Sequence, residues 1–337
     1  MRPLYDQGAA GLAQILQRLT TTASVLHVGA HPDDEDSAFL ARAARGDHAR
    51  VAYLALNRGE GGQNIIGPEL FDALGVIRTE ELLQARRLDG AQQFFTRAFD
   101  FGFSKTRSET AALWNEQAVL EDMVRVIRTF RPLVVYSRFS GTPADGHGHH
   151  QEAGYLTPVA FKAAADPSAF PELAKEGVRV WQARKLYSSG RGGGAGPLTQ
   201  VATGITDPAI GRTYTEIAAE GRSQHKSQAM GTIEPLGPAT SALRQMESRV
   251  PAGAAEQSVF DGLDVTMVLG ASQPSVSKHL NVLRNVGLVH VRRDGKNVLY
   301  RTNADALRPL HEWTGTFQRY WGRQLRRIQE HAEAKEK

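Results

Sequence analysis

Short apolar runs alternate with helix-like segments over the first half of the chain, and this alternation constrains the fold more than any other feature. The strand-like runs are residues 24–30, 48–56, 94–99 and 132–137. The helix-like segments are residues 36–45, 78–93, 115–130 and one that begins at His150. Strands that alternate with helices predict a parallel sheet. We therefore expect an α/β fold, a Rossmann-like parallel sheet flanked by helices.

Two polar clusters follow strands of this predicted sheet. His31-Pro32-Asp33-Asp34-Glu35 comes directly after the first strand, and a loop from Arg138 to His149 follows the strand that ends at Ser137. Open parallel sheets bind ligands beyond the carboxyl ends of their strands. Both clusters are therefore expected at the ligand-binding edge.

The residues of the two clusters include the parts of a metal-dependent hydrolase. The chain has no cysteine, so histidine and carboxylate side chains must hold any metal. His31 and Asp34 lie three positions apart, as do His147 and His150. A catalytic zinc site needs about three protein ligands and an open position for water. Asp33 adjoins Asp34 and could serve as general base, and a further donor could stabilise an oxyanion.

A plainer interpretation of the same residues stays open at this point. Carboxylates after a strand can cap the N-terminus of a helix, where negative charge is favourable. The three histidines among residues 147–150 could be solvated loop residues. Spacing alone does not decide between these interpretations.

The motif Ala30-His31-Pro32-Asp33-Asp34-Glu35, with a His-x-x-His pair beginning 116 positions after His31, resembles the LmbE-like (PIG-L) family of zinc N-deacetylases. The similarity extends over most of residues 20–250. It implies a hydrolase that removes the acetyl group from an N-acetylated sugar or a related small molecule.

The resemblance also implies the residue roles. It makes His31, Asp34 and His150 the ligands of one zinc ion per chain. It makes Asp33 the general base, and His147 the residue that polarises the carbonyl or stabilises the oxyanion. His149 is a rival for the ligand position, but the family spacing favours His150.

Four further residues are predicted to contact the substrate, each with an alternative. Asp145 occupies a place where relatives often carry a polar residue that faces the substrate. Glu60 could instead organise its glycine-rich loop, Arg78 could pair with Glu80 or Glu81 on its helix, and Asp100 could end a strand.

The N-terminal twenty residues lack the apolar core of a secretory signal, and the chain has no apolar run of transmembrane length. We therefore expect a cytoplasmic protein that does not contact a membrane, with exported relatives and homo-oligomers left open. Hydrophobic residues make up 41% of the chain, enough to bury a sizeable core.

The C-terminal segment differs from the rest in charge. Residues 271–337 contain 13 lysines and arginines against six acidic residues, whereas the whole chain carries a net charge of only +4. A basic segment of this kind can bind nucleic acid or be a solvated surface. The pattern of residues 264–301 predicts a helix, a turn, a second helix that stops at Gly287, and a hairpin with Asp294-Gly295 at its turn.

This pattern, from Ser272-Gln-Pro-Ser-Val-Ser-Lys-His-Leu280 to Leu299-Tyr300-Arg301, resembles the winged helix-turn-helix of ArsR-type repressors. The resemblance implies DNA contacts by a recognition helix and by the basic wing. The implied recognition-helix residues are Gln273, Ser275, Ser277 and Lys278. The implied wing residues are Arg292, Arg293 and Lys296.

The similarity to ArsR-type domains is partial, because the two helices that normally precede this motif are not evident. We expect a deacetylase domain over residues 1–250, a linker over 251–263 and a partial winged helix over 264–337. The alternative functions are an ArsR-type DNA-binding regulator, or a fusion with a tail that has lost its function.

Overall fold

The chain divides into two units in this computed structural model, Met1–Thr266 and Met267–Lys337. The residues that the structure describes are 4–190, 195–231, 233–251, 256–266, 284–285, 287, 289–295, 297–303, 305–306 and 308. No helix among these residues is long and apolar enough to cross a membrane.

A seven-stranded sheet, counted over the described residues, forms the centre of the first unit. Its strands, in spatial order, are β3 (Gln92–Phe95), β2 (Arg50–Ala55), β1 (Ser24–Gly29), β4 (Val134–Ser137), β5 (Lys185–Ser189), β9 (Thr240–Ser248) and β6 (Leu198–Ala202). The first five are parallel, whereas β9 is antiparallel to both β5 and β6. A two-stranded ribbon, β7 (Thr206–Asp207) with β8 (Arg212–Thr213), lies apart from this sheet.

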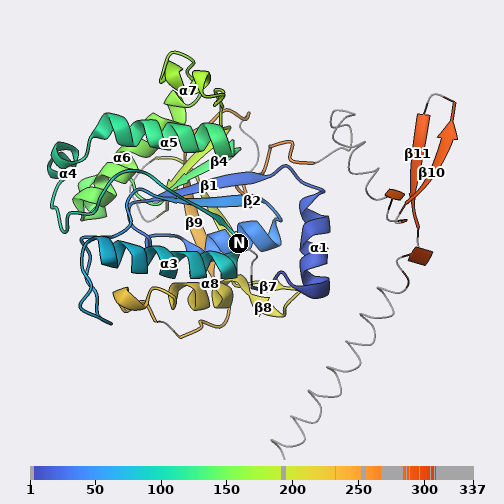
Figure 1. Cartoon of the computed structure of the whole chain (residues 1–337), viewed down its shortest axis with the longest axis horizontal. Helices are drawn as coiled ribbons and strands as arrows, with labels where there is room; N and C mark the ends of the chain where they lie inside the picture. The colour runs from blue at the N-terminus through green and yellow to red at the C-terminus, as the bar shows by residue number, and fades with distance from the viewer. Residues whose placement is uncertain are drawn as a thin grey trace, which may run out of the picture. The chain divides into compact units, whose positions relative to one another are not determined.

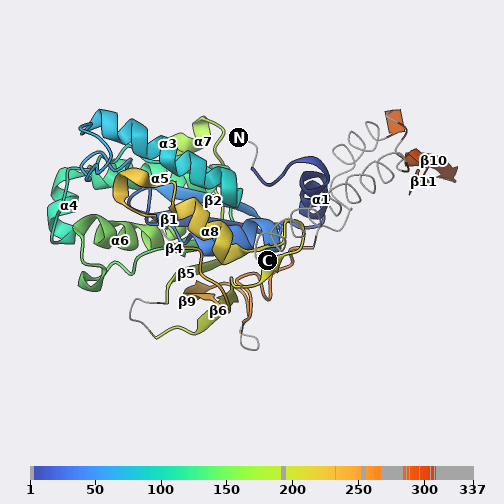
Figure 2. The same cartoon turned by 90° about the horizontal axis from the view of Figure 1, so that it is seen from below.

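Helices cover both faces of the sheet (Figures 1 and 2). The α-helices are α1 (Gly8–Arg18), α2 (Ser37–Ala41), α3 (Asp72–Asp89), α4 (Arg107–Leu113), α5 (Glu116–Phe130), α6 (Gly148–Ala163), α7 (Pro171–Lys175) and α8 (Tyr214–Arg222). Short helical turns are η1 (Arg42–Gly46), η2 (Pro143–Asp145) and η3 (Lys226–Gln228). One apolar core lies between the sheet and α5 and α6, and a second lies on the opposite face with α2. The predicted α/β architecture is thus confirmed.

The element boundaries agree with the sequence pattern to different degrees. β1, β2, β4 and α5 lie within one or two residues of their predicted ranges, and Asn115 caps α5 by accepting a hydrogen bond from the amide of Ala118. Helix α3 begins six residues earlier than predicted, and the strand predicted over 94–99 runs instead over Gln92–Phe95. Apolar side chains at 98, 99 and 101 line a loop, where their pattern imitates a strand.

The strand order reverses between β1 and β4. From β1 the chain moves outward to β2 and β3, and it then returns to the other side of β1 through β4 and β5. Such a reversal separates the loops that follow the two central strands and leaves a crevice where ligands bind. The two polar clusters of the sequence follow β1 and β4, so both lie at this switch point.

The first unit extends past the predicted boundary at residue 250. The described part of the predicted linker includes Val259 and Phe260, which are buried in the core that contains Tyr187 and Leu243. Glu256 accepts hydrogen bonds from Lys185 Nζ and from the hydroxyl of Tyr187. Apolar burial and the pairing of a buried lysine hold this segment against the sheet, up to a bridge at Thr266.

The second unit contains a β-hairpin, formed by β10 (Val289–Asp294) and β11 (Asn297–Thr302). Asp294 pairs with Asn297 across the turn, and Gly295 has the positive φ of 59° that such a turn requires. Gly287 also has positive φ, as expected for a residue that ends a helix. The predicted wing is therefore present as a hairpin, whereas the preceding helices lie outside the described residues.

Candidate metal centre

The loop after β1 is folded by its own aspartate. Asp34 Oδ2 accepts hydrogen bonds from the amides of Ala30, at 3.0 Å, and His31, at 2.6 Å. The hydroxyl of Tyr53 in β2 donates to the carbonyl of His31 at 2.6 Å. These contacts turn the chain sharply and place the side chains of His31 and Asp34 next to each other.

The loop after β4 is held by a second aspartate. The carboxylate of Asp145 accepts hydrogen bonds from the amides of Ser140, Gly141 and Thr142. The carbonyl of Asp145 lies 3.2 Å from His150 Nδ1. Because a carbonyl only accepts, Nδ1 carries the proton and His150 Nε2 keeps a free lone pair.

Helix α6 starts in the middle of the histidine cluster, because His147 is its N-cap. His147 Nδ1 accepts from the amide of His149 at 3.0 Å, so its Nε2 carries the proton in the neutral ring. A Cβ on Gly148 would lie 2.3 Å from the carbonyl oxygen of Thr106 and 2.4 Å from Ser104 Oγ. The first turn of α6 is thus pressed against the segment before α4.

His31, Asp34 and His150 converge from these two loops. His31 Nδ1 lies 3.2 Å from Asp34 Oδ2 and 3.2 Å from His150 Nε2, and His150 Nε2 lies 3.4 Å from Asp34 Oδ1. Ligands about 2.0–2.1 Å from a tetrahedral zinc ion are separated by about 3.3 Å. The two imidazole nitrogens and the two Asp34 oxygens that contact them are therefore spaced as ligands of one metal ion would be, and one ligand atom from each of the three residues lies within 4.8 Å of the others.

The electrostatics of this trio favour bound positive charge. Burial alone would raise the pKa of Asp34, but the neighbouring His150 and His31 outweigh it and hold the pKa well below its usual value. Burial alone would lower the pKa of His150, and the Asp34 carboxylate raises it. The carboxylate thus stays ionised between two imidazoles, which is the charge state that a metal ligand needs.

His149 approaches His31 at the other ring nitrogen from His150, and it belongs to a second trio of side chains that could hold a metal ion. Its fully buried ring stacks on Trp114, and its Nδ1 lies 3.1 Å from His31 Nε2. Burial first, and then the neighbouring histidines, lower the pKa of His149 to about 2. His149 contacts Nε2 of His31, the ring nitrogen that does not face Asp34. His31, His147 and His149 form one cluster of possible metal ligands, and His31, Asp34 and His150 form another.

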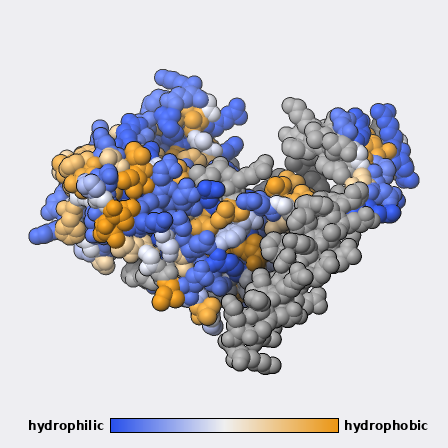
Figure 3. Space-filling model, turned by 60° about the horizontal axis from the view of Figure 1, so that its bottom comes forward, coloured by the Kyte–Doolittle hydropathy of each residue, from blue (hydrophilic) through white to orange (hydrophobic). Residues whose placement is uncertain are grey.

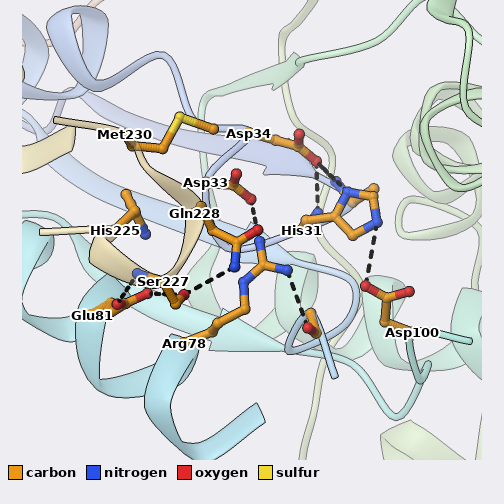
Figure 4. Close-up of polar contacts among 12 residues, drawn as sticks. His31, Asp33, Asp34, Arg78, Glu81, Asp100, His225, Ser227, Gln228 and Met230 are labelled. Atoms are coloured by element: carbon orange, nitrogen blue, oxygen red, sulfur yellow. Dashed lines mark hydrogen bonds and ion pairs between the residues drawn. The ribbon is translucent and has the colours of Figure 1, made fainter. Parts of the chain in front are cut away.

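Asp33 lies beside this trio and contacts Arg78 of α3 (Figure 4). The Arg78 guanidinium also donates to the carbonyl of Gly59, at 3.1 Å. Neither Glu80 nor Glu81 pairs with Arg78 among the described residues, since Glu81 accepts from the amide and hydroxyl of Ser227. A tertiary contact to the metal loop therefore replaces the local helix pair that the sequence offered as an alternative.

The remaining predicted substrate residues are engaged within the protein. Glu60 accepts from the amides of Arg58, at 3.1 Å, and Asp100, at 3.2 Å, so it organises the glycine-rich loop. Asp100 lies in a loop rather than at a strand end, and its carboxylate is 3.8 Å from His31 Nε2. The carboxylate of Asp145 accepts hydrogen bonds from the backbone amides of its own loop. Glu60 and Asp145 thus shape the site, whereas Asp100 also faces His31.

Sequence reasoning missed a buried ionic network beneath the metal loop. Glu35 is 1% exposed and accepts from His225 Nε2, at 3.0 Å, and from Arg86, at 3.3 Å. Burial would raise the pKa of Glu35, but His225 and Arg86 outweigh it and hold the pKa at about 2. The motif placed Glu35 next to Asp34, but no local signal linked it to a histidine 190 positions away.

Apolar side chains lie at the mouth of the site as well. Phe103 is 74% exposed, and its ring centroid is 5.1 Å from that of His147. Phe139 stacks on His150 with ring centroids 4.0 Å apart. Figure 3 shows several groups of apolar side chains among hydrophilic ones on the visible face of the molecule. A ligand that enters would meet both polar and apolar surface.

Two of the predicted DNA-contacting residues can be located. Arg292 and Arg293 are exposed and lie on β10, paired with Leu299 and Val298. Both arginines lie within the strand itself, before the Asp294-Gly295 turn. The other predicted contacts lie outside the described residues: Gln273, Ser275, Ser277, Lys278 and Lys296.

Comparison with known proteins agrees with this geometry. Residues 26–161 match the sequence profile of the GlcNAc-PI de-N-acetylase (PIG-L) family, and residues 264–291 match that of the arsR family of bacterial regulatory proteins. A 1D-myo-inositol 2-acetamido-2-deoxy-alpha-D-glucopyranoside deacetylase of Thermobifida fusca is 35% identical, over 49% of this chain and 60% of its own length. A deacetylase of the same name from Frankia alni is 32% identical, over 48% of this chain and 60% of its own length.

A solved structure, the N,N'-diacetylchitobiose deacetylase of Pyrococcus horikoshii, aligns with a TM-score of 0.47 and 17% identity, over 61% of this chain and 70% of that one. The chain spans about 60% of the length of the two curated relatives. Within the first unit, residues 26–161 are thus similar to the PIG-L (LmbE-like) deacetylase family, and the arsR-type helix-turn-helix match follows at residues 264–291.

Proposed function

We propose that the chain is a zinc-dependent N-deacetylase that holds one zinc ion on His31, Asp34 and His150. The convergence of these three side chains carries the proposal, because their ligand atoms lie 3.2–3.4 Å apart. The donor set of two imidazoles and one carboxylate is one that catalytic zinc sites use. Nothing in the three-sided arrangement requires a fourth protein ligand, so a coordination position remains for water.

The roles of the neighbouring residues follow from their hydrogen bonds. A bound zinc ion would lower the pKa of its water to about 7 and polarise a carbonyl. Asp33, held in place by Arg78, would take the proton of the attacking water as general base. The Arg78 contact fixes the direction of the Asp33 carboxylate.

His147 is suited to stabilise the oxyanion. Its Nδ1 is occupied by the amide of His149, so the neutral ring offers only its Nε2–H. Burial first, and then His31 and His150, lower the pKa of His147 to about 4, so the ring is neutral at pH 7. A preorganised N–H aimed at the developing negative charge is worth about 10²–10³-fold in rate. Asp33 or His147 would then pass a proton to the departing amine.

The substrate class comes from the relatives. Those described above are deacetylases of an acetamido glucoside, and a third relative is a mycothiol S-conjugate amidase of Streptomyces coelicolor. An N-acetylated sugar conjugate therefore fits the proposal best, with acetate and a free amine as products.

Metal analysis combined with an acetate-release assay on a panel of N-acetylated sugars tests this function. The expected result is about one zinc per chain and release of acetate. Asp33→Asn should keep the metal and lose turnover, whereas the exposed Asp264→Asn should change neither. A chain that binds no zinc, or an Asp33→Asn variant with full turnover, would overturn the proposal.

A second function, DNA binding by the C-terminal unit, is favoured by the arsR-family match and the exposed pair on the wing. Contacts of Arg292 and Arg293 with phosphates would make binding fall steeply with salt. A gel-shift titration at several salt concentrations should show this dependence in the full chain. An Arg292→Gln/Arg293→Gln double variant should bind more weakly and with a smaller salt slope. An Arg308→Gln variant, which removes one exposed charge from the same unit, serves as the control. Equal binding by the double variant would refute the wing contact.

A further inference from the structure

A cavity of about 530 Å³ opens beside the metal loop, on the α2 and α8 side of the sheet. Its walls come from the residues after β1, from the ends of β4 and β5, and from α8 and β9. Glu35 and Asp36, which follow Asp34 directly, line it. The cavity therefore begins within two residues of a proposed zinc ligand, yet none of the three proposed ligands lines it.

Two arginines line this cavity, and neither forms an ion pair with a carboxylate among the described residues. Arg222 of α8 contacts the carbonyl of Asp33, at 3.4 Å, and the sulfur of Met230. Arg138 follows β4, and the negative charges of Asp36 and Asp34 act to raise the pKa of its guanidinium. The half-buried guanidiniums thus keep hydrogen-bond donors for a ligand, one of them on the backbone of the proposed general base.

The acidic residues of the cavity are already engaged. Asp36 accepts from the amide of Phe39 and from the hydroxyls of Tyr136 and Ser241. Glu35 is paired with His225 and Arg86 through Oε1. These bonds engage Asp36 and Glu35 Oε1 within the protein, without an ion pair to either cavity arginine among the described residues.

Three buried polar atoms of the lining have no hydrogen-bond partner among the described residues: Glu35 Oε2, Ser37 Oγ and Thr215 Oγ1. Ser37 is 3% exposed and Glu35 1% exposed. Leaving such groups unpaired is costly. Because these three atoms lie below the cavity surface, the groups that a ligand can reach are the two arginines of the lining.

We propose that this cavity binds an anionic group of the substrate, a phosphate or a carboxylate, on Arg138 and Arg222. This proposal rests on the proposed deacetylase function and names its substrate class as acidic N-acetylated sugars. Arginine suits the task because its planar donor array matches phosphate and carboxylate oxygens.

Calorimetric titration of the zinc-loaded full chain tests the proposal. The ligands are N-acetylglucosamine, its 1-phosphate and its 6-phosphate, and N-acetylmuramic acid, which carries a carboxylate. At least one acidic sugar should bind about tenfold or more tightly than N-acetylglucosamine. Whether a phosphorylated sugar or N-acetylmuramic acid binds more tightly identifies the preferred anion. Raised salt should weaken the acidic ligand only moderately, because the site is partly buried.

Arg138→Gln and Arg222→Gln should each remove most of the acidic ligand's advantage and leave the affinity for N-acetylglucosamine unchanged. Arg179→Gln, which removes an exposed charge beyond α7, is the matched control and should behave as wild type. Asp34→Asn separates the arginine site from direct binding of the anion to zinc, because the preference should survive there. Equal affinities across the panel, a preference that survives both arginine changes, or one lost in Asp34→Asn would each overturn the proposal.

The outcomes also distinguish this inference from the proposed function. Acetate released equally from neutral and acidic sugars would leave the deacetylase standing and refute the anion site. If acidic sugars bind through the arginines but no sugar of the panel releases acetate, the anion site would stand and the deacetylase function would be refuted.

Discussion

Replacing Glu35 by glutamine should destabilise the first unit at neutral pH by an amount that the structure allows us to estimate. The carboxylate bonds to His225 and Arg86 in a site that is 1% exposed, and its pKa is lowered from 4.5 to about 2. Since one pKa unit corresponds to about 1.4 kcal/mol, the ionised form contributes roughly 3 kcal/mol of stability. Glutamine keeps the shape but loses the charge, so most of this free energy should disappear.

The two pKa values of Glu35 also determine the pH range over which this stabilisation is lost. A lowered folded-state pKa means that the contribution is complete above about pH 4.5 and is lost as the pH falls towards 2. Urea denaturation of wild type and Glu35→Gln, followed by tryptophan fluorescence, should show a gap of about 2–3 kcal/mol at pH 7 that narrows below pH 4.5. Glu172→Gln, at an exposed position of α7, should leave the urea midpoint unchanged. A Glu35→Gln variant as stable as wild type at pH 7 would refute the reasoning.

The remaining predictions concern the metal centre. Asp33→Asn should retain zinc and reduce kcat in the acetate assay by about 10²–10⁴-fold; loss of zinc would instead mark it as a ligand. His147→Gln should lower kcat by about 10²–10³-fold with little change in KM, and a rise in KM alone would point to substrate binding. His150→Gln should abolish zinc binding while His149→Gln keeps the metal, and the opposite result would reverse the ligand assignment. Asp145→Ala should weaken zinc affinity about 10–100-fold, as measured by competition with a chelator, because it releases the loop that orients His150. Unchanged affinity would separate the loop from the metal centre.

The sequence predicted the part of the fold that carries the strongest pattern. The runs that became β1 and β4 are mostly apolar and fully buried, because both faces of a parallel strand are covered, and the polar residues after them marked the sheet edge. The second half of the sheet was not predictable in this way. β9 buries only Ser241 and Leu243 over Thr240–Ser248, and its antiparallel pairing with β5 and β6 depends on contacts far along the chain.

In the candidate site, some residues could be predicted from local motifs and others could not. His31, Asp34 and His150 could be found because two short motifs contain them, whereas their approach in space required the β1–β4 pairing. Arg78 was predicted to contact the substrate, with a pair to Glu80 or Glu81 as the alternative, and its contact with Asp33 was not predicted because that residue lies 45 positions away. The partners that the fold supplies, His225 for Glu35 and Arg222 for the backbone of Asp33, lie some 190 positions away and have no motif.

Gly148, in the first turn of α6, should not tolerate the glycine-to-alanine change that usually stabilises a helix. Glycine within a helix is usually improved by alanine, by about 1 kcal/mol. Here a methyl group would collide with the Thr106 carbonyl and push the start of α6 outward, together with the imidazoles on either side. A randomised library at position 148 screened for turnover should therefore return glycine alone. A designer who transplants this turn to another scaffold must supply a groove with room for a bare backbone.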